Sequence, residues 1–276
     1  MSAREQTRAL YPDQQGSIER DGVRVSWERY GSGEPTLLLL PAWSIIHSRH
    51  WKAQIPYLAR HYRVVTFDGR GNGRSDRPTE PEAYAEPEFA ADAIAVMDAT
   101  GTDRAVIVGF SMGAHRGLLL AANHPERVEA AVFIGANYPG GGEPVAERTV
   151  YSWEDELDTD EGWAKHNYHY WLRDYQGYLE FFMSRMFSEP HSTKPIEDGV
   201  GWGLDTTPET LSLTYLAPFM KPDEARELAG RVRCPVLVIH GEDDGHSSVT
   251  RGIALAEHTG GRLVLLEGSF HAPHVR

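Results

Sequence analysis

Six short apolar segments are spaced along the chain, and in each one the apolar residues run continuously instead of alternating with polar ones. Continuous runs predict strands that are buried on both faces, as in a parallel sheet covered by helices. The predicted strands span residues 36–42, 63–68, 105–110, 130–136, 235–241 and 262–268. The earlier segment 17–31 alternates more and carries a turn signal at Asp21 and Gly22, which predicts an antiparallel hairpin at the sheet edge.

Helical patterns fill several of the spaces between these runs. Residues 88–100 place four apolar side chains on one helical stripe, and Gly101 follows directly. The four are Phe89, Ala93, Val96 and Met97. Two more helical segments, 111–125 and 247–260, end at a proline and a glycine. This alternation predicts the α/β class, with a doubly wound, mostly parallel sheet of the eight-stranded type once the hairpin is included.

The region from 140 to 228 breaks this rhythm. It opens with three glycines, and 11 of the chain's 28 aromatic residues fall within residues 151–187. Because it is inserted between two core strands, we expect it to lie over the carboxyl edge of the sheet, where α/β proteins bind ligands. We therefore predict a core in two parts, residues 1–139 and 229–276, with a helical cap at 140–228. Most of the rings should pack the cap helices together.

Composition narrows the function classes. The chain has 276 residues, 41% apolar and 24% charged, as in soluble globular proteins. A net charge of −13 without a basic run argues against a nucleic-acid partner. No apolar stretch reaches the ~18 residues of a membrane span, and the N-terminus lacks a signal-peptide core, so we expect a cytoplasmic protein without membrane association. The single cysteine, Cys234, is interpreted as a small hydrophobe, not a nucleophile.

Residues 109–113, Gly-Phe-Ser-Met-Gly, follow a predicted strand and open a predicted helix. This is the context that the G-x-S-x-G motif requires. Ser111 would occupy a strained turn that pushes its hydroxyl clear of the sheet, and the flanking glycines have no Cβ to collide with their surroundings. The backbone N–H of Met112 would then face the same space and could donate to an oxyanion.

Serine needs a base, and the base needs an orienting carboxylate. In this fold the order along the chain is serine, then an acid, then histidine. Glu242, Asp243 and Asp244 follow one predicted strand, and His271 and His274 follow the last one. All of them would lie at the carboxyl ends of strands, where the fold brings such residues together.

Five segments of the sequence resemble the α/β-hydrolase superfamily, in the branch of esterases, enol-lactonases, perhydrolases and carbon–carbon bond hydrolases. They occur in the family's order and spacing and cover nearly the whole chain, with the cap as the least similar part. The segments are DGRGNGRSD, GFSMG, NHPERV, PVLVIHGEDD and LEGSFHAPH. The resemblance implies that Ser111 is the nucleophile, Asp244 the acid and His271 the base, without a cofactor. Glu242 and Asp243 are then expected to be solvated.

One departure from the family concerns the oxyanion loop. The family commonly has His-Gly after the third strand, where this chain has Pro41 and Ala42. Trp43 is then the expected second N–H donor beside Met112, with a geometry that the missing glycine restricts. Its indole is expected to form a pocket wall.

Other polar residues have simpler interpretations. His115 is expected to pack or line a pocket, and His240 to make a local hydrogen bond. His274 is expected to cap the chain end or face solvent. The acidic and histidine-rich segment 240–246 is not expected to bind a metal. The glycine-rich segment 68–76 lacks the spacing and helix of a dinucleotide site, so it is interpreted as a structural turn.

We therefore predict a serine hydrolase that cleaves a carboxylic ester, lactone or activated carbonyl through an acyl-enzyme. The aromatic cap favours a partly apolar or aromatic small molecule, with His166 or His169 as further contacts. Two alternatives stay open: an acyltransferase with the same triad, and a small-molecule sensor on the same fold that turns over slowly or not at all.

The chain stops five residues after His271, where the family continues into a further helix. We expect either a segment of a longer protein or a core without that cover, and a homo-oligomer is a further expectation.

Overall fold

The computed structural model describes residues 9–275, so the N-terminal segment that was expected to lack a signal peptide begins outside the described residues. Eight strands form one sheet in the order β1-β2-β4-β3-β5-β6-β7-β8. Each predicted apolar run forms a strand whose ends lie within three residues of the expected ones. The strands are β1 Gln14–Arg20, β2 Val23–Tyr30, β3 Thr36–Leu39, β4 Arg63–Phe67, β5 Ala105–Phe110, β6 Val128–Ile134, β7 Val236–Gly241 and β8 Arg262–Leu266.

The predicted hairpin is confirmed at one edge of the sheet. β1 pairs antiparallel with β2, and Arg20 lies opposite Val23. The two-residue loop between them has positive φ at both Asp21 (52°) and Gly22 (75°), as a type I′ turn requires. β2 also pairs antiparallel with β4, whereas all pairs from β4 to β8 are parallel. The predicted doubly wound, mostly parallel sheet is therefore confirmed.

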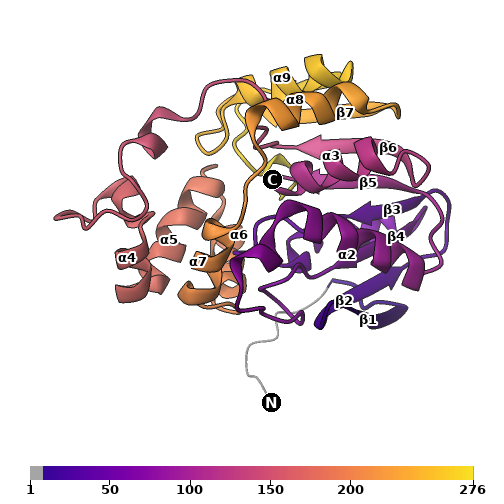
Figure 1. Cartoon of the computed structure of the whole chain (residues 1–276), viewed down its shortest axis with the longest axis horizontal. Coiled ribbons are helices and arrows are strands. Elements are labelled where there is room, and N and C mark those ends of the chain that lie inside the picture. The colour runs from indigo at the N-terminus through magenta and orange to yellow at the C-terminus, as the bar shows by residue number, and fades with distance from the viewer. Residues whose placement is uncertain (1–8, 276) are drawn as a thin grey trace.

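Four helices cover one face of the sheet (Figure 1). They are α2 Glu86–Ala99, α3 Gly113–Asn123, α8 Pro222–Arg231 and α9 Val249–Thr259. Their apolar stripes pack on alternate strand residues such as Leu38, Ile107 and Phe133, which are fully buried. Cys234 is partly buried against this core. Across the described residues, each helix is too short or too polar to cross a bilayer.

On the other face of the sheet, the apolar core continues into a helical cap. Short helices η1 Ser48–Trp51 and α1 Ile55–Leu58 lie on the core side, and the cap contains η3 Ala146–Thr149, η4 Gly162–Lys165, α4 Tyr168–Arg173, α5 Tyr175–Met186, α6 Thr193–Gly203 and α7 Pro208–Leu216. Figure 1 shows the cap helices beside the carboxyl ends of the parallel strands. One apolar cluster runs from Phe110 in β5 and Trp51 into Trp171 and Phe182 of the cap. The predicted boundary at residue 228 falls inside α8, which packs against α3 and α9.

The expectation that every apolar run is buried on both faces is wrong for β8. This strand pairs with β7 alone and forms the second edge of the sheet. Val264 is 41% exposed and Leu265 is 38% exposed. A continuous apolar run indicates a strand, but it does not say how many layers cover that strand.

The glycine-rich segment 68–76, read as a structural turn, connects the core to the cap. Asp68 accepts hydrogen bonds from the Ser48 hydroxyl at 2.5 Å and from the Arg74 backbone N–H at 2.9 Å. The side chain of Asn72, which is fully buried, donates to the carbonyl oxygen of Trp202 in α6 at 3.1 Å. The turn therefore fixes one side of the cap over the sheet.

Candidate active site

The turn between β5 and α3 holds Ser111 at the carboxyl edge of the sheet. β5 ends at Phe110, α3 begins at Gly113, and Ser111 between them has a φ of 52°. Among the residues described, Asp21 is the one other non-glycine with positive φ, a conformation that costs energy. A Cβ on Gly109 would come within 2.4 Å of the Gly113 carbonyl oxygen, so this sharp turn requires glycine there.

Loops after β7 and β8 bring Asp244 and His271 to Ser111. Nε2 of His271 lies 3.1 Å from Ser111 Oγ, and Nδ1 of His271 lies 2.8 Å from Asp244 Oδ2. The His271 ring is completely buried. Residues that are 160 and 27 positions apart in the sequence thus form one hydrogen-bonded chain.

Four donors surround the Asp244 carboxylate. Oδ1 accepts hydrogen bonds from the backbone N–H groups of His246 and Ser247, each at 2.8 Å. Oδ2 lies 3.0 Å from His240 Nε2 in addition to its contact with His271. Burial raises the pKa of Asp244, but the charge of His271 and the hydrogen bonds from His240 and His271 outweigh it and hold the pKa below its ordinary value. Asp244 is therefore ionised at neutral pH.

The predictions for His240, Glu242 and Asp243 concern their contacts and exposure. His240 makes a local contact, with Nε2 2.9 Å from the Ser247 carbonyl oxygen, but its approach to Asp244 was not predicted. Glu242 and Asp243 are exposed.

Within residues 9–275, the structure contains no group of three or more histidine, cysteine or acidic side chains placed to hold a metal ion.

The expectation that His274 caps the chain end or faces solvent is wrong. Both ring nitrogens are buried, and the ring centroid lies 4.8 Å from that of Trp51 and 4.6 Å from that of Phe110. The chain turns inward after His271 and carries His274 on the short helix η5 Pro273–Val275. His115 is buried as expected, and its Nε2 hydrogen-bonds the carbonyl oxygen of Asn137.

The two expected oxyanion donors, Trp43 and Met112, line the same cavity as Ser111. In the described part of the chain, neither backbone N–H donates to another protein group. The loop that lacks glycine is held from below by Arg116, whose Nη1 donates to the carbonyl oxygens of Pro41 (2.8 Å) and Ala42. Arg116 is itself buried and lies 3.2 Å from Oε2 of Glu86. The hydrogen bonds from Arg116 hold the loop in which Pro41 and Ala42 stand where the family has His-Gly.

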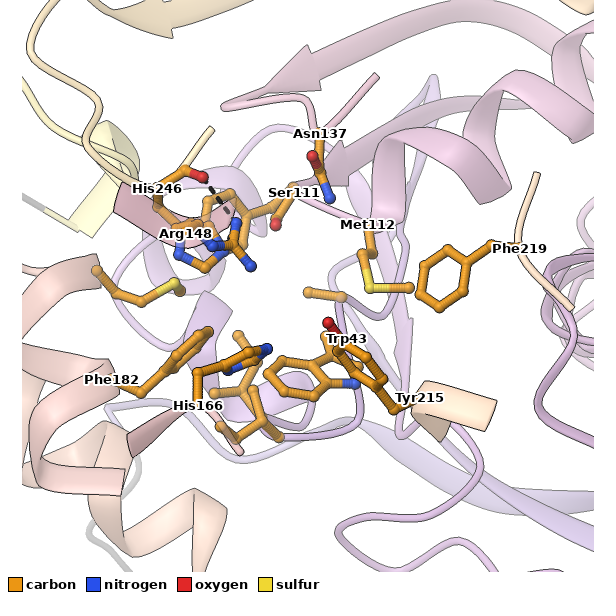
Figure 2. Close-up of a pocket in the computed structure, with 15 residues that line it drawn as sticks. Trp43, Ser111, Met112, Asn137, Arg148, His166, Phe182, Tyr215, Phe219 and His246 are labelled. Atoms are coloured by element: carbon orange, nitrogen blue, oxygen red, sulfur yellow. Dashed lines mark hydrogen bonds between the residues drawn. The ribbon is translucent and has the colours of Figure 1, made fainter. Parts of the chain in front are cut away.

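A cavity of about 320 Å³ opens beside Ser111 (Figure 2). Its walls are mostly apolar and come from both the core and the cap. The Trp43 indole forms one wall, as predicted, and its Nε1 donates to Thr214 Oγ1 of α7 at 2.7 Å. His166 lines the cavity, whereas His169 is exposed with Nε2 3.2 Å from the Glu154 carbonyl oxygen.

Two residues of the cavity were missed by sequence reasoning. The His246 ring lies against His271, with 4.4 Å between the ring centroids. Arg148 of η3 donates to the His246 carbonyl oxygen at 2.7 Å and to its Nε2 at 3.3 Å. The position of His246, two residues after Asp244, was a usable signal. The sequence around Arg148 carries no such signal, because this four-residue helix has neither a motif nor a long periodic pattern.

Comparison with known proteins gives the same fold over nearly the whole chain. A family model described as the alpha/beta hydrolase fold matches residues 35–275. The serine hydrolase BPHL of Mus musculus is 26% identical over 93% of this chain and 79% of its own length. The solved structure of the esterase RhEst1 from Rhodococcus sp. ECU1013 is 26% identical, with a TM-score of 0.76 over 94% of this chain and 92% of that one.

Higher identity is found over shorter stretches. A RutD protein of Caulobacter segnis is 42% identical over 84 residues, which are 30% of this chain and 32% of that protein. This chain therefore matches only about a third of the length of such curated relatives. The family model, in contrast, covers all of the chain from β3 onward. The chain therefore belongs to the α/β hydrolase family.

Proposed function

We propose that this protein is a serine hydrolase that cleaves a carboxylic ester or lactone through an acyl-enzyme. The observation that carries the proposal is the hydrogen-bonded chain from Ser111 Oγ through His271 to Asp244 at the wall of an apolar cavity. The same geometry serves nucleophilic catalysis on several unrelated folds. Apart from the substrate and a water molecule, the proposed steps use side chains and backbone groups of this chain.

In the acylation step, Ser111 Oγ attacks the substrate carbonyl carbon while its proton moves to His271 Nε2. The negative charge of Asp244 stabilises the imidazolium and keeps its Nδ1–H directed at Oδ2. The N–H groups of Met112 and Trp43 receive the oxyanion. When the tetrahedral intermediate collapses, the ester C–O bond breaks and His271 gives its proton to the leaving alkoxide.

In the deacylation step, a water molecule takes the place of the alcohol. His271 Nε2 accepts a proton from this water as its oxygen attacks the acyl carbon, and the same proton then returns to Ser111 Oγ. The carboxylic acid leaves and the enzyme is restored. The names of two relatives favour this chemistry, since RhEst1 is an esterase and BPHL is a serine hydrolase.

The test is hydrolysis of p-nitrophenyl esters of increasing chain length by the wild type and by Ser111→Ala. We expect the variant to lose kcat by about 10³-fold or more, because no other group in the cavity replaces the nucleophile. Ser184→Ala is the matched control, since Ser184 is exposed in the cap. Equal rates for the wild type and Ser111→Ala would overturn the proposal.

A second measurement identifies the nucleophile directly. A fluorophosphonate should label the Ser111 peptide, as detected by mass spectrometry, and His271→Ala should greatly slow the labelling. Addition of alcohol acceptors to the ester assay separates hydrolysis from acyl transfer, because transfer yields a new ester instead of the free acid.

A further inference from the structure

Arg148 brings a cation into the cavity from the short helix η3, on the path from β6 to the cap helices. Figure 2 shows its guanidinium beside His246, facing the space that Ser111 also faces. The guanidinium carbon lies 5.0 Å from the centroid of the Trp163 ring. Because the His246 ring contacts His271, Arg148 lies close to the proposed catalytic groups.

No carboxylate in residues 9–275 forms an ion pair with Arg148. Among the described residues, none places an acidic oxygen within 4.0 Å of the guanidinium, and its buried Nε has no hydrogen-bond partner. Asp244 is the acidic residue whose charge acts on Arg148, but all four of the donors described above already occupy its two oxygens. Arg148 is half-buried with its Nε shielded from solvent, and cations in such sites are normally paired, so this one has unused capacity for an anion.

The other groups of the cavity leave it with a positive charge. None of the described residues that line it is acidic, and Arg148 is the one arginine or lysine among them. Burial and Arg148 lower the pKa of His166 to about 3, and burial and Arg148 also lower the pKa of His246 well below its ordinary value. Both histidines are therefore neutral at pH 7. Arg251, behind the cavity, donates to Oδ1 of Asn137 and adds to the positive potential.

His166 offers a second polar contact on the same side. Its Nδ1 lies 3.0 Å from the Tyr178 hydroxyl, and its buried Nε2 has no partner among the described groups. His166 and Arg148 both lie against Trp163. When the Tyr178 hydroxyl donates to Nδ1, Nε2 carries the ring proton and becomes a neutral donor near the guanidinium.

We infer that Arg148 is the binding site for a carboxylate on the substrate, so that the substrate class is an ester or lactone that also carries a carboxylate group. The inference rests on the proposed hydrolase function. A single planar guanidinium matches one planar carboxylate in shape and charge. The aromatic walls formed by Trp43, Phe182 and Tyr215 then hold the apolar part between the carboxylate and the scissile bond.

The kinetic test compares matched anionic and neutral esters. In one pair, 4-butyryloxybenzoate and 4-butyryloxybenzamide, the carboxylate or the neutral amide lies on the leaving group. In the other pair, monoethyl adipate and ethyl adipamate, the carboxylate or the amide lies on the acyl group. In at least one pair, we expect the wild type to show a kcat/KM about tenfold or more higher for the anion.

Substitutions assign that preference to Arg148. Arg148→Met should bring the ratio of anionic to neutral kcat/KM to about one, and Arg148→Lys should keep part of it, because lysine retains the charge without the planar fork. Arg185→Met is the matched control, since Arg185 is an exposed cap arginine that stacks on Phe181 outside the cavity. A wild-type ratio near one in both pairs, or an unchanged ratio in Arg148→Met, would overturn the inference.

A binding experiment separates this inference from the proposed chemistry. Calorimetry on Ser111→Ala should show that 4-phenylbutyrate binds about tenfold or more tightly than 4-phenylbutyramide, and Ser111→Ala/Arg148→Met should lose the difference. If carboxylate binding is seen but Ser111 is not labelled, the inference stands and the acyl-enzyme mechanism fails. If Ser111 is the nucleophile but amide and carboxylate bind equally, the mechanism stands and the inference fails.

Discussion

His240 and His271 approach the same oxygen of Asp244, with ring nitrogens 3.0 Å and 2.8 Å from Oδ2. The other oxygen is held by two backbone N–H groups of the following loop. The carboxylate therefore cannot rotate without breaking several hydrogen bonds at once. If Asp244 orients the proposed base, we expect His240 to act on the reaction through Asp244 without touching the substrate.

His240→Leu should lower kcat on p-nitrophenyl esters by on the order of 10- to 100-fold, because a small displacement of the base misaligns proton transfer. KM should change much less, since His240 does not line the cavity. His240→Gln should recover much of kcat, because its amide nitrogen can replace Nε2 as the donor. His61→Leu, at an exposed histidine, is the control. A loss of kcat no larger than that of the control would show that Asp244 does not depend on His240.

Removal of one partner from the buried ion pair between Arg116 and Glu86 should strongly destabilise the fold. Arg116→Met leaves Glu86 buried without its partner and releases the carbonyl groups of Pro41 and Ala42, so the free energy of unfolding should fall by about 3–5 kcal/mol. Urea unfolding measures the change. The double variant Arg116→Met/Glu86→Gln should be more stable than Arg116→Met alone, because the uncompensated charge is gone. Purely additive losses would contradict this account.

Much of the fold was predictable because the relevant signals are local. A continuous apolar run indicates a strand that lies between two layers. The two residues Asp21 and Gly22 are enough to indicate the hairpin turn. Ser111, Asp244 and His271 could also be selected, since each follows a strand and the family order fixes their sequence. Their mutual distances, in contrast, come from the packing of β5, β7 and β8 side by side.

The unpredicted features depend on contacts between distant segments. Arg148 enters the cavity only because the segment that carries η3 contacts a loop 98 residues later in the sequence. The ring nitrogens of His274 are buried because the chain places this ring against Phe110, which neither its spacing from His271 nor its polarity indicates. The exposure of β8 depends on which strand lies at the sheet edge. None of these three features produces a periodic pattern of apolar and polar residues in the sequence.

Buried histidines should make the protein sensitive to mild acid, and His274 offers a clear test. Burial, with a smaller effect from His271, lowers the pKa of His274 to about 3, whereas histidine in the unfolded chain has a pKa of about 6.5. Between these values the unfolded state binds a proton that the folded state does not, so the free energy of unfolding decreases as pH falls. When the pH is lowered from 7.5 to 5, the free energy of unfolding should therefore decrease by about 2 kcal/mol less in His274→Phe than in the wild type, as measured by urea unfolding. Phenylalanine suits the site, because the ring packs against Trp51 and both nitrogens lack partners. His61→Phe, at the surface, should follow the wild type, and equal acid sensitivity of all three proteins would rule out His274 as a source of the effect.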